Sequence, residues 1–313
     1  MDKKPVLITG GAGFLGTHLA RHLLAGGFRV RSLDLKTPRY AVKGVTYMRG
    51  DARIKVTLTR AIKGCQAVFH LAAITSVPVC QDAPYEGYRS NFMMTCDVLE
   101  AVRFESLRAK SSLRFIFSGS SVMYGHLGEK DIGIKEDTPL SQPLSFYGSQ
   151  ILASEQAIKL YVQRFGIEAV TFRLFNLFGH GQDPSSPYSG VITKFQDLIN
   201  KREPLCLHGG GEQTRDFVAV EDAARACAQA LKIPATACKG DAINIGTGRS
   251  ITIKELAQIM NAVSKTHSPL KKTPTRQGDV LHSKADISRA GTILKWEPRI
   301  DLEQGLRKLI AGL

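Results

Sequence analysis

A glycine-rich segment near the start of the chain constrains the fold more than any other feature of the sequence. The apolar, strand-like run Val6–Thr9 leads directly into Gly10, Gly13 and Gly16, and an amphipathic helix is predicted to follow. Glycines at this spacing let the backbone approach a pyrophosphate at the N-terminus of a helix. The segment therefore predicts a dinucleotide-binding turn between a parallel strand and its crossover helix.

An aspartate farther along the chain indicates which dinucleotide this turn would hold. Asp34 follows the next strand-like run, where a carboxylate accepts hydrogen bonds from both ribose hydroxyls and repels a 2′-phosphate. We therefore predict NAD as the cofactor. Lys36 and Arg39 lie close to this carboxylate and keep NADP open as an alternative.

Short apolar runs alternate with helix-length segments through the first half of the chain. Such alternation favours a parallel sheet with crossover helices, a Rossmann-type, doubly wound α/β fold. The predicted strands are Val6–Thr9, Arg29–Leu33, Ala67–Leu71, Arg114–Ser118 and Ala169–Arg173. The predicted helical segments between them are Thr17–Ala25, Leu58–Ile62, Phe92–Phe104 and Gly148–Phe165.

The character of the sequence changes after Phe175. A stretch rich in Gly, Pro and Ser spans Gly179–Gly190, and within a compact chain such a stretch is typical of a functional binding loop. We predict an NAD-binding domain over residues 1–175, to which the segment 217–245 returns. Residues 176–216 and 246–313 are predicted to form a smaller, partly interleaved C-terminal substrate lobe.

Composition excludes several classes of protein. The chain has 42 Lys and Arg against 28 Asp and Glu, and its 43% apolar and 22% charged residues are ordinary for a globular protein rather than a disordered one. The net charge of +14 is spread along the chain without interleaved aromatic residues, so no nucleic-acid partner is predicted.

The six cysteines are widely scattered and form no C-x-x-C pair, which argues against zinc ribbons and redox motifs. We expect free thiols and no metal site. The chain has no apolar run of about 18 residues, the length that a membrane-spanning helix requires, and no room for a signal peptide before Val6. These features predict a cytoplasmic protein without a membrane partner.

Several motifs, in order, resemble those of the extended short-chain dehydrogenase/reductase family. They include the glycine-rich turn, Arg49-Gly-Asp-Ala52, His70-Leu-Ala-Ala73, Phe117-Ser-Gly-Ser-Ser-Val-Met-Tyr-Gly125 and Arg173-Leu-Phe-Asn176. The resemblance covers nearly the whole chain and is strongest to NAD-dependent sugar-nucleotide epimerases and dehydratases, in particular UDP-sugar 4-epimerases. It implies a homodimer that pairs through the helices Phe92–Phe104 and Gly148–Phe165.

The resemblance also implies two sets of binding residues. NAD would be held by Gly10, Gly13, Phe14, Leu15, Gly16, Asp34, Asp51, Ala52, Leu71, Ala72, Ala73, Asn91 and Tyr147. A UDP-sugar would be held by Ser120, Asn176, Val191, Arg215, Arg276, Asp279 and Ser283. The two arginines would form bidentate bonds to the diphosphate, and the small Ser283 would admit an N-acetyl group on the sugar.

The catalytic pair implied by the resemblance is Tyr147, the base, and Ser120, the hydrogen-bond donor to the reacting oxygen. The family motif is Tyr-x-x-x-Lys, yet this chain has Tyr147-Gly-Ser-Gln-Ile151. Without the lysine, the pKa of Tyr147 starts near the model value of about 10, so only about one part in a thousand is phenolate at pH 7. Whether Lys194 or another lysine reaches the site stays open.

Three interpretations therefore follow from the sequence. The first is an NAD-dependent epimerase acting at C4 of UDP-glucose, UDP-galactose or their N-acetyl forms through a 4-keto intermediate. The second is a catalytically impaired protein that binds NAD and a UDP-sugar. The third is another nucleotide-sugar epimerase or dehydratase. The dehydratases and decarboxylases that this chain resembles have acidic residues after the catalytic hydroxyl, where this chain has Ser121 and Val122.

Overall fold

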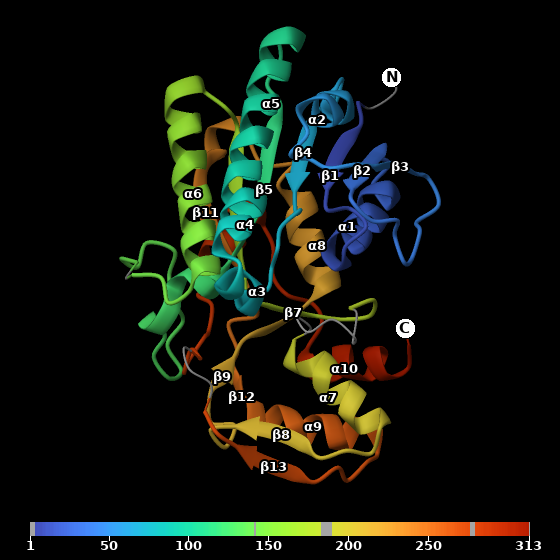
Figure 1. Cartoon of the computed structure of the whole chain (residues 1–313), viewed down its shortest axis with the longest axis vertical. Helices are drawn as coiled ribbons and strands as arrows, with labels where there is room; N and C mark the ends of the chain where they lie inside the picture. Colours follow the sequence, from blue (N-terminus) through green and yellow to red (C-terminus); the bar gives the residue numbers. More distant parts are fainter. Residues whose placement is uncertain (1–3, 141, 183–189, 276–278, 313) are drawn as a thin grey trace.

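The computed structural model describes residues 4–140, 142–182, 190–275 and 279–312. A seven-stranded sheet organises the upper part of the molecule, with a smaller lobe beneath it (Figure 1). The strand order is β11-β6-β5-β4-β1-β2-β3, and every pairing in this sheet is parallel. The predicted Rossmann-type, doubly wound parallel sheet is confirmed.

The strands of this sheet are β1 (Val6–Thr9), β2 (Val30–Asp34), β3 (Val45–Arg49), β4 (Ala67–His70), β5 (Arg114–Ser120), β6 (Ala169–Leu174) and β11 (Lys239–Ile245). β1, β4 and β6 are buried along their whole length, as expected for parallel strands covered on both faces. β5 extends to Ser120, two residues beyond the predicted end, so the candidate catalytic serine is the last residue of a central strand.

Helices cover both faces of the sheet. One face packs against α2 (Lys55–Ile62), α5 (Met94–Ala109) and α6 (Phe146–Phe165), and the other against α1 (Phe14–Ala25) and α8 (Val220–Gln229). Short segments before α5 are α3 (Val77–Asp82), α4 (Pro84–Tyr88) and the π-turn η1 (Arg89–Met93), and the 3-10 turn η2 (Ser121–Leu127) follows β5. The apolar periodicity of the sequence did not predict the π-turn η1. Such turns are frequent at functional sites.

The lower lobe has its own apolar core. It contains α7 (Val191–Asn200), β8 (Leu205–His208), β9 (Thr214–Arg215), β12 (Ile251–Thr252), α9 (Ile253–Ser264), β13 (Leu270–Thr273) and α10 (Leu302–Ile310). The connecting elements are β7 (Asn176–Phe178), β10 (Phe217–Ala219), η3 (Ala235–Ala237) and η4 (Ala290–Leu294). All six cysteines are free, as predicted, and no described helix is long and apolar enough to cross a membrane.

A buried ion pair joins α6 to the sheet. Arg173 on β6 and Glu155 on α6 have side chains only 3% and 1% exposed, and Arg173 Nε donates to Glu155 Oε2 at 3.1 Å. Arg173 Nη1 also donates to the Tyr124 hydroxyl at 2.9 Å, and that hydroxyl donates to Asn244 Oδ1 at 2.7 Å. The pair therefore holds the helix that carries Tyr147 at a fixed position on the sheet.

Removing one partner of this pair should destabilise the protein strongly. Arg173→Met leaves the Glu155 carboxylate buried without its cation, so we expect the free energy of unfolding to fall by about 3–5 kcal/mol in urea titrations. Arg307→Met is the matched control, since Arg307 pairs with Glu303 on α10 where both side chains are more than half exposed, and it should cost less than about 1 kcal/mol. Equal losses in the two variants would contradict this role for the buried pair.

Candidate active site

The glycine-rich turn packs against neighbouring backbone so closely that side chains at Gly10 and Gly16 would not fit. Gly10 has a φ of +73°, and a Cβ there would lie 2.7 Å from the backbone nitrogen of Ala72. A Cβ on Gly16 would lie 2.4 Å from the Gly10 carbonyl oxygen. α1 starts at Phe14 with Gly13 as its N-cap and no side-chain cap, so the N–H groups of its first turn fit a pyrophosphate.

Helix α1 begins three residues before the predicted start. The sequence signal for a helix was its apolar periodicity, and that periodicity does not reach Phe14 and Leu15. The structure places both residues in the first turn of the helix, and Leu15 is buried there. We call the turn from Gly10 to Gly16 the cradle. The predicted residues Gly10, Gly13, Phe14, Leu15 and Gly16 therefore lie together in one turn.

Asp34 lies beside this turn at the end of β2. Its Oδ2 accepts a hydrogen bond from the backbone of Ala12 at 3.0 Å, and its Oδ1 accepts one from the backbone of Lys36 at 3.0 Å. These two bonds fix the carboxylate where an adenosine ribose would lie. The residues present therefore fit NAD, whose ribose hydroxyls would complete the acceptor sites of Asp34.

Asp51 and Ala52 follow β3, the neighbouring strand. The guanidinium of Arg53 donates to both oxygens of Asp51, at 3.1 Å from Nε to each and 2.8 Å from Nη2 to Oδ2. This bond to Arg53 holds the pKa of Asp51 below its usual value, although partial burial acts the other way. Arg53 was not among the predicted residues, and its position two residues after Asp51 carried no distinctive signal.

A buried hydrogen-bond chain runs beneath the cradle. Thr95 donates its hydroxyl to the Asn91 carbonyl at 2.6 Å, so its oxygen accepts from His70 Nε2 at 3.1 Å. His70 Nδ1 is then an acceptor for the Thr9 hydroxyl at 2.8 Å. Burial lowers the pKa of His70 to about 3, so the ring is neutral, with its proton on Nε2.

This chain supports the segment Leu71–Ala73, which follows β4. Leu71 donates its N–H to the Thr9 carbonyl at 3.1 Å. Asn91 extends the chain from η1, since its Oδ1 accepts from the backbone of Ile74 at 2.8 Å and its Nδ2 donates to the Ile74 carbonyl at 3.1 Å. The predicted residues Leu71, Ala72, Ala73 and Asn91 thus form one ordered wall beside the cradle.

The two candidate catalytic hydroxyls meet at the carboxyl edge of the sheet. Ser120 ends β5, and Tyr147 lies in the first turn of α6, which Ser145 caps by accepting from the Gly148 N–H at 3.1 Å. Burial raises the pKa of Tyr147 to about 12, while a hydrogen bond from Ser120 lowers it and the nearby Cys80 raises it further. Burial dominates, so Tyr147 is a neutral phenol at neutral pH.

Ile151 lies four residues after Tyr147, where the sequence resemblance implies a lysine. Its side chain is 2% exposed and belongs to the apolar core between α6 and the sheet. Its Cγ2 lies 3.6 Å from the point where a Cβ on Gly119 would be. In the part of the chain that the structure describes, the groups that set the pKa of Tyr147 include no cation. Lys194, whose reach was left open, lies on α7 in the other lobe.

The predicted substrate residues lie at the junction of the sheet with the lower lobe. Asn176 begins β7, Val191 begins α7, and Ser283 is half-buried in the segment before η4. Arg215 on β9 is paired with Asp279 through Nη2 and Oδ1 at 2.5 Å, and burial lowers the pKa of this arginine. The remaining predicted residue, Arg276, lies outside the described residues.

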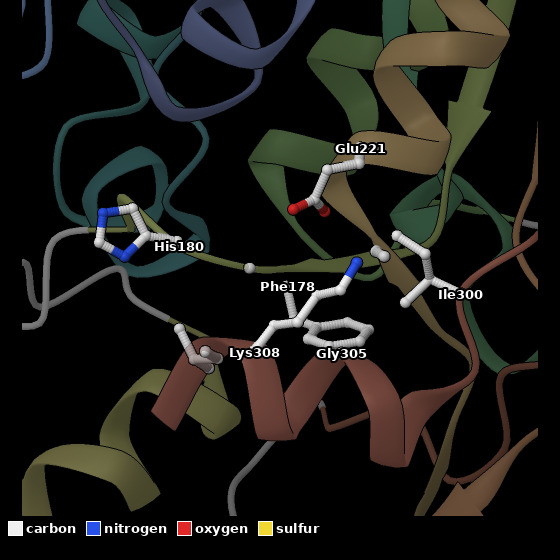
Figure 2. Close-up of a pocket in the computed structure, with 9 residues that line it drawn as sticks. Phe178, His180, Glu221, Ile300, Gly305 and Lys308 are labelled. Atoms are coloured by element: carbon white, nitrogen blue, oxygen red, sulfur yellow. The ribbon is translucent and has the colours of Figure 1, made fainter. Parts of the chain in front are cut away.

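A separate hollow lies between β7, the N-terminus of α8 and α10. Figure 2 shows Glu221 and Lys308 pointing into it from opposite elements, with His180 at one side. Its other side is closed by Phe178, Ile300 and the helix that carries Gly305. None of its lining residues is a predicted site residue, so we assign it no part in the candidate active site.

Comparisons with known proteins agree with this geometry. Residues 6–246 match the model of the NAD dependent epimerase/dehydratase family. A protein of Methanocaldococcus jannaschii, provisionally described as a UDP-glucose 4-epimerase, is 32% identical over 97% of each chain. A UDP-N-acetyl-alpha-D-glucosaminuronate decarboxylase of Bacillus cytotoxicus is 28% identical over 98% of this chain and 97% of its own.

A solved structure is similar over the full length. It is the UDP-N-acetylglucosamine 4-epimerase of Methanobrevibacter ruminantium in complex with UDP-N-acetylmuramic acid, with a TM-score of 0.88, 30% identity and coverage of 100% of this chain and 98% of that one. The fold and the glycine-rich turn define the class of Rossmann-type dinucleotide-binding proteins, and the relatives named above are described as nucleotide-sugar enzymes. This chain belongs to the NAD dependent epimerase/dehydratase family, which confirms the predicted family and cofactor.

Asp34 should decide between the two dinucleotides. In Asp34→Ser the ribose hydroxyls of NAD lose a charged acceptor, so we expect NAD to bind about tenfold more weakly. The carboxylate that repels the 2′-phosphate of NADP is also removed, so NADP affinity should fall less or rise. Calorimetric titration with each dinucleotide measures both affinities. Asp82→Ser, on the exposed surface of α3, is the control that should change neither. An unaltered ratio of NAD to NADP affinity in Asp34→Ser would contradict this assignment.

Proposed function

We propose that this protein is an NAD-dependent epimerase that inverts C4 of a UDP-sugar through a transient 4-keto intermediate. The observation that carries the proposal is the placement of Ser120, the last residue of β5, and Tyr147, in the first turn of α6, at the carboxyl edge of the sheet that also carries the glycine-rich turn, where Ser120 acts on the pKa of Tyr147. Membership of an epimerase family supports it. So does the similarity to two proteins described as 4-epimerases.

The chemistry divides between the cofactor and the chain. NAD supplies reversible hydride acceptance at the sugar carbon. In its phenolate form, Tyr147 would accept the proton of the 4-hydroxyl as the hydride leaves C4, and Ser120 would donate a hydrogen bond to the same oxygen. The protonated Tyr147 would then return this proton to the 4-keto oxygen when C4 is reduced on its opposite face, which would give the inverted alcohol and restore the phenolate.

The UDP end is assigned to the lower lobe. In the proposal, residues 1–175 and 217–245 bind the cofactor, and 176–216 and 246–313 bind the UDP-sugar. Asn176, Val191, Arg215 and Asp279 would hold the nucleotide, and Arg276 would be the second arginine on its diphosphate. The small Ser283 leaves UDP-N-acetylhexosamines acceptable beside UDP-hexoses, and the cytoplasm is the proposed location.

One observation favours a second candidate, an NAD- and UDP-sugar-binding protein with impaired catalysis. With the pKa of Tyr147 raised to about 12 and Ile151 in the lysine position, about one part in a hundred thousand of Tyr147 is phenolate at pH 7 before the ligands bind. The binding residues are the same in both candidates. They differ only in whether Tyr147 can accept a proton fast enough for turnover.

A homodimer is also part of the proposal. The residues Ile151 and Ile158, on the helix predicted to pair, are 2% and 0% exposed and pack inside the subunit. A different apolar set on η1, α5 and α6 is exposed and available for a second copy: Met93, Phe104, Leu107, Leu160 and Phe165. The mass in solution, measured by light scattering, tests this pairing, and a monomer at micromolar concentration would contradict it.

Turnover can be observed directly. Proton NMR of the anomeric region, with protein and NAD incubated with UDP-glucose or with UDP-N-acetylglucosamine, should show the galacto epimer appear. Tyr147→Phe keeps the ring but removes the proton acceptor, so it should lower the rate at least a hundredfold while NAD still binds. No epimer with either sugar at high enzyme concentration, together with measured UDP-sugar binding, would establish the second candidate instead.

The missing lysine predicts an unusual pH profile. Because the pKa of Tyr147 is raised, the active phenolate grows with pH, so kcat should still be rising at about pH 10 instead of reaching a plateau near neutrality. In Ile151→Lys the ammonium favours the phenolate, so kcat at pH 7 should rise at least tenfold and the plateau should move to lower pH.

Gln156→Lys is the control for the added charge, since Gln156 is exposed farther along the same helix and should leave the profile unchanged. Thermal unfolding shows whether a lysine in the core position 151 is tolerated with NAD bound. A flat profile between about pH 6 and 9 in the unmodified protein would mean that another group is the base.

A further inference from the structure

Gln150 is a wholly buried amide in the helix that carries Tyr147. Its side chain is 0% exposed, and it lies between Tyr147 and Ile151 in the first turns of α6. Its Oε1 accepts from Asn91 Nδ2 at 2.7 Å, and its Nε2 donates to the Pro84 carbonyl at 3.5 Å. A buried amide costs stability unless it is hydrogen-bonded, so these partners fix its orientation.

Gly87 on α4 makes room for this amide. A Cβ on Gly87 would lie 2.4 Å from Gln150 Nε2 and 3.0 Å from both Cδ and Oε1. The φ of Gly87 is not positive, so its conformation does not require glycine. The absence of a side chain at this position therefore serves the close approach of the Gln150 amide.

The amide connects α6 to the wall of the cofactor site. Asn91 Nδ2 donates to Gln150 Oε1, and the Asn91 amide also bonds both backbone groups of Ile74. The segment ending at Ile74 follows β4 and lies against Gly10, since a Cβ on Gly10 would be 2.9 Å from Ala72 Cα. Gln150 thus joins the helix of Tyr147 to the segment 71–74 through one intermediate side chain.

The topology shows which half of the dinucleotide this segment serves. β4 lies between β1 and β5, while Asp34 is on the other side of β1. Dinucleotides bind across the carboxyl edge of such a sheet where the strand order reverses. The adenosine half therefore belongs with Asp34, and the nicotinamide half with the segment 71–74, Ser120 and Tyr147.

We propose that Gln150 is a positioning residue, which fixes Asn91 and the segment 71–74 so that the nicotinamide half of NAD lies in register with Tyr147. The role of Tyr147 in this assignment rests on the proposed function. The presence of NAD rests on the family to which the chain belongs. Gln150 itself would contact neither the sugar nor the nicotinamide, because its amide is bonded to the Asn91 side chain and the Pro84 carbonyl.

The test compares two ligands that share the adenosine half. Gln150→Met keeps the length of the side chain and removes its hydrogen bonds, so we expect NAD binding to weaken about tenfold while binding of ADP changes less than twofold. Gln150→Glu keeps an oxygen to accept from Asn91 and should retain most of the NAD affinity. Calorimetric titrations with NAD and with ADP measure all of these affinities on the full chain.

Gly87→Ala tests the same amide without altering Gln150. The added Cβ displaces the amide, so this variant should reproduce the selective loss of NAD affinity. Gln156→Met makes the same substitution at an exposed position of α6 and is the control. Thermal unfolding of every variant shows that the comparison is between folded proteins.

Two results would overturn the proposal. Equal weakening of NAD and ADP by Gln150→Met would show a general structural role, and unchanged NAD binding in both Gln150→Met and Gly87→Ala would show none. The readout does not require turnover. If the protein binds NAD but epimerises no UDP-sugar, the proposed function fails while the contrast between NAD and ADP still decides the role of Gln150.

Discussion

The buried hydrogen-bond chain through His70 is the interaction on which the candidate site depends. It ties β1 to β4 through Thr9, and β4 to the helical layer through Thr95 and Asn91. The chain works only with a neutral ring, and burial supplies that condition by lowering the pKa of His70 to about 3. Because unfolded histidine binds a proton near pH 6.5, this contribution to stability is present at neutral pH and is lost as the pH falls from there toward 3.

The candidate site lies between this hydrogen-bonded polar segment and the apolar core under α6. On one side, Asn91 donates a hydrogen bond to Gln150, and the remaining atoms of both amides bond the backbone. On the other side, Ile151 packs into the core at the position where the resemblance implies a lysine. Tyr147, the proposed base, therefore ionises only at high pH, because burial raises its pKa to about 12. Residue 151 lies on α6 and is not part of the glycine-rich turn, so the proposed loss of catalysis would not by itself remove cofactor binding.

Much of this could be predicted from the sequence. The parallel sheet followed from alternating apolar runs, and the cradle from glycines placed between a strand and a helix. Asp34 was identifiable by its position at the end of the second strand. These features are local, because each depends on residues that are close together in the chain.

The rest depends on contacts between distant residues. Gln150 meets Asn91 across 59 positions, and Arg173 meets Glu155 across two elements of different type, so neither pairing had a local signal. The π-turn at Asn91 has no characteristic periodicity, and the sequence prediction began the helix at Phe92, after this residue. The raised pKa of Tyr147 comes from burial, which follows from the packing of α6 and not from the motif around the tyrosine.

Tyr147 is a neutral phenol at the carboxyl edge of the sheet, and the proposed turnover depends on this state. The most direct measurement is carbon NMR of protein labelled at the tyrosine ring, with the Tyr147 resonance assigned by its loss in Tyr147→Phe and followed through an alkaline titration without cofactor. Because burial raises the pKa of Tyr147 to about 12, this resonance should keep the shift of a phenol at about pH 10, where a free tyrosine is half ionised. A Tyr147 that is already phenolate well below about pH 10 would contradict it, and would mean that a cation reaches the phenol despite Ile151.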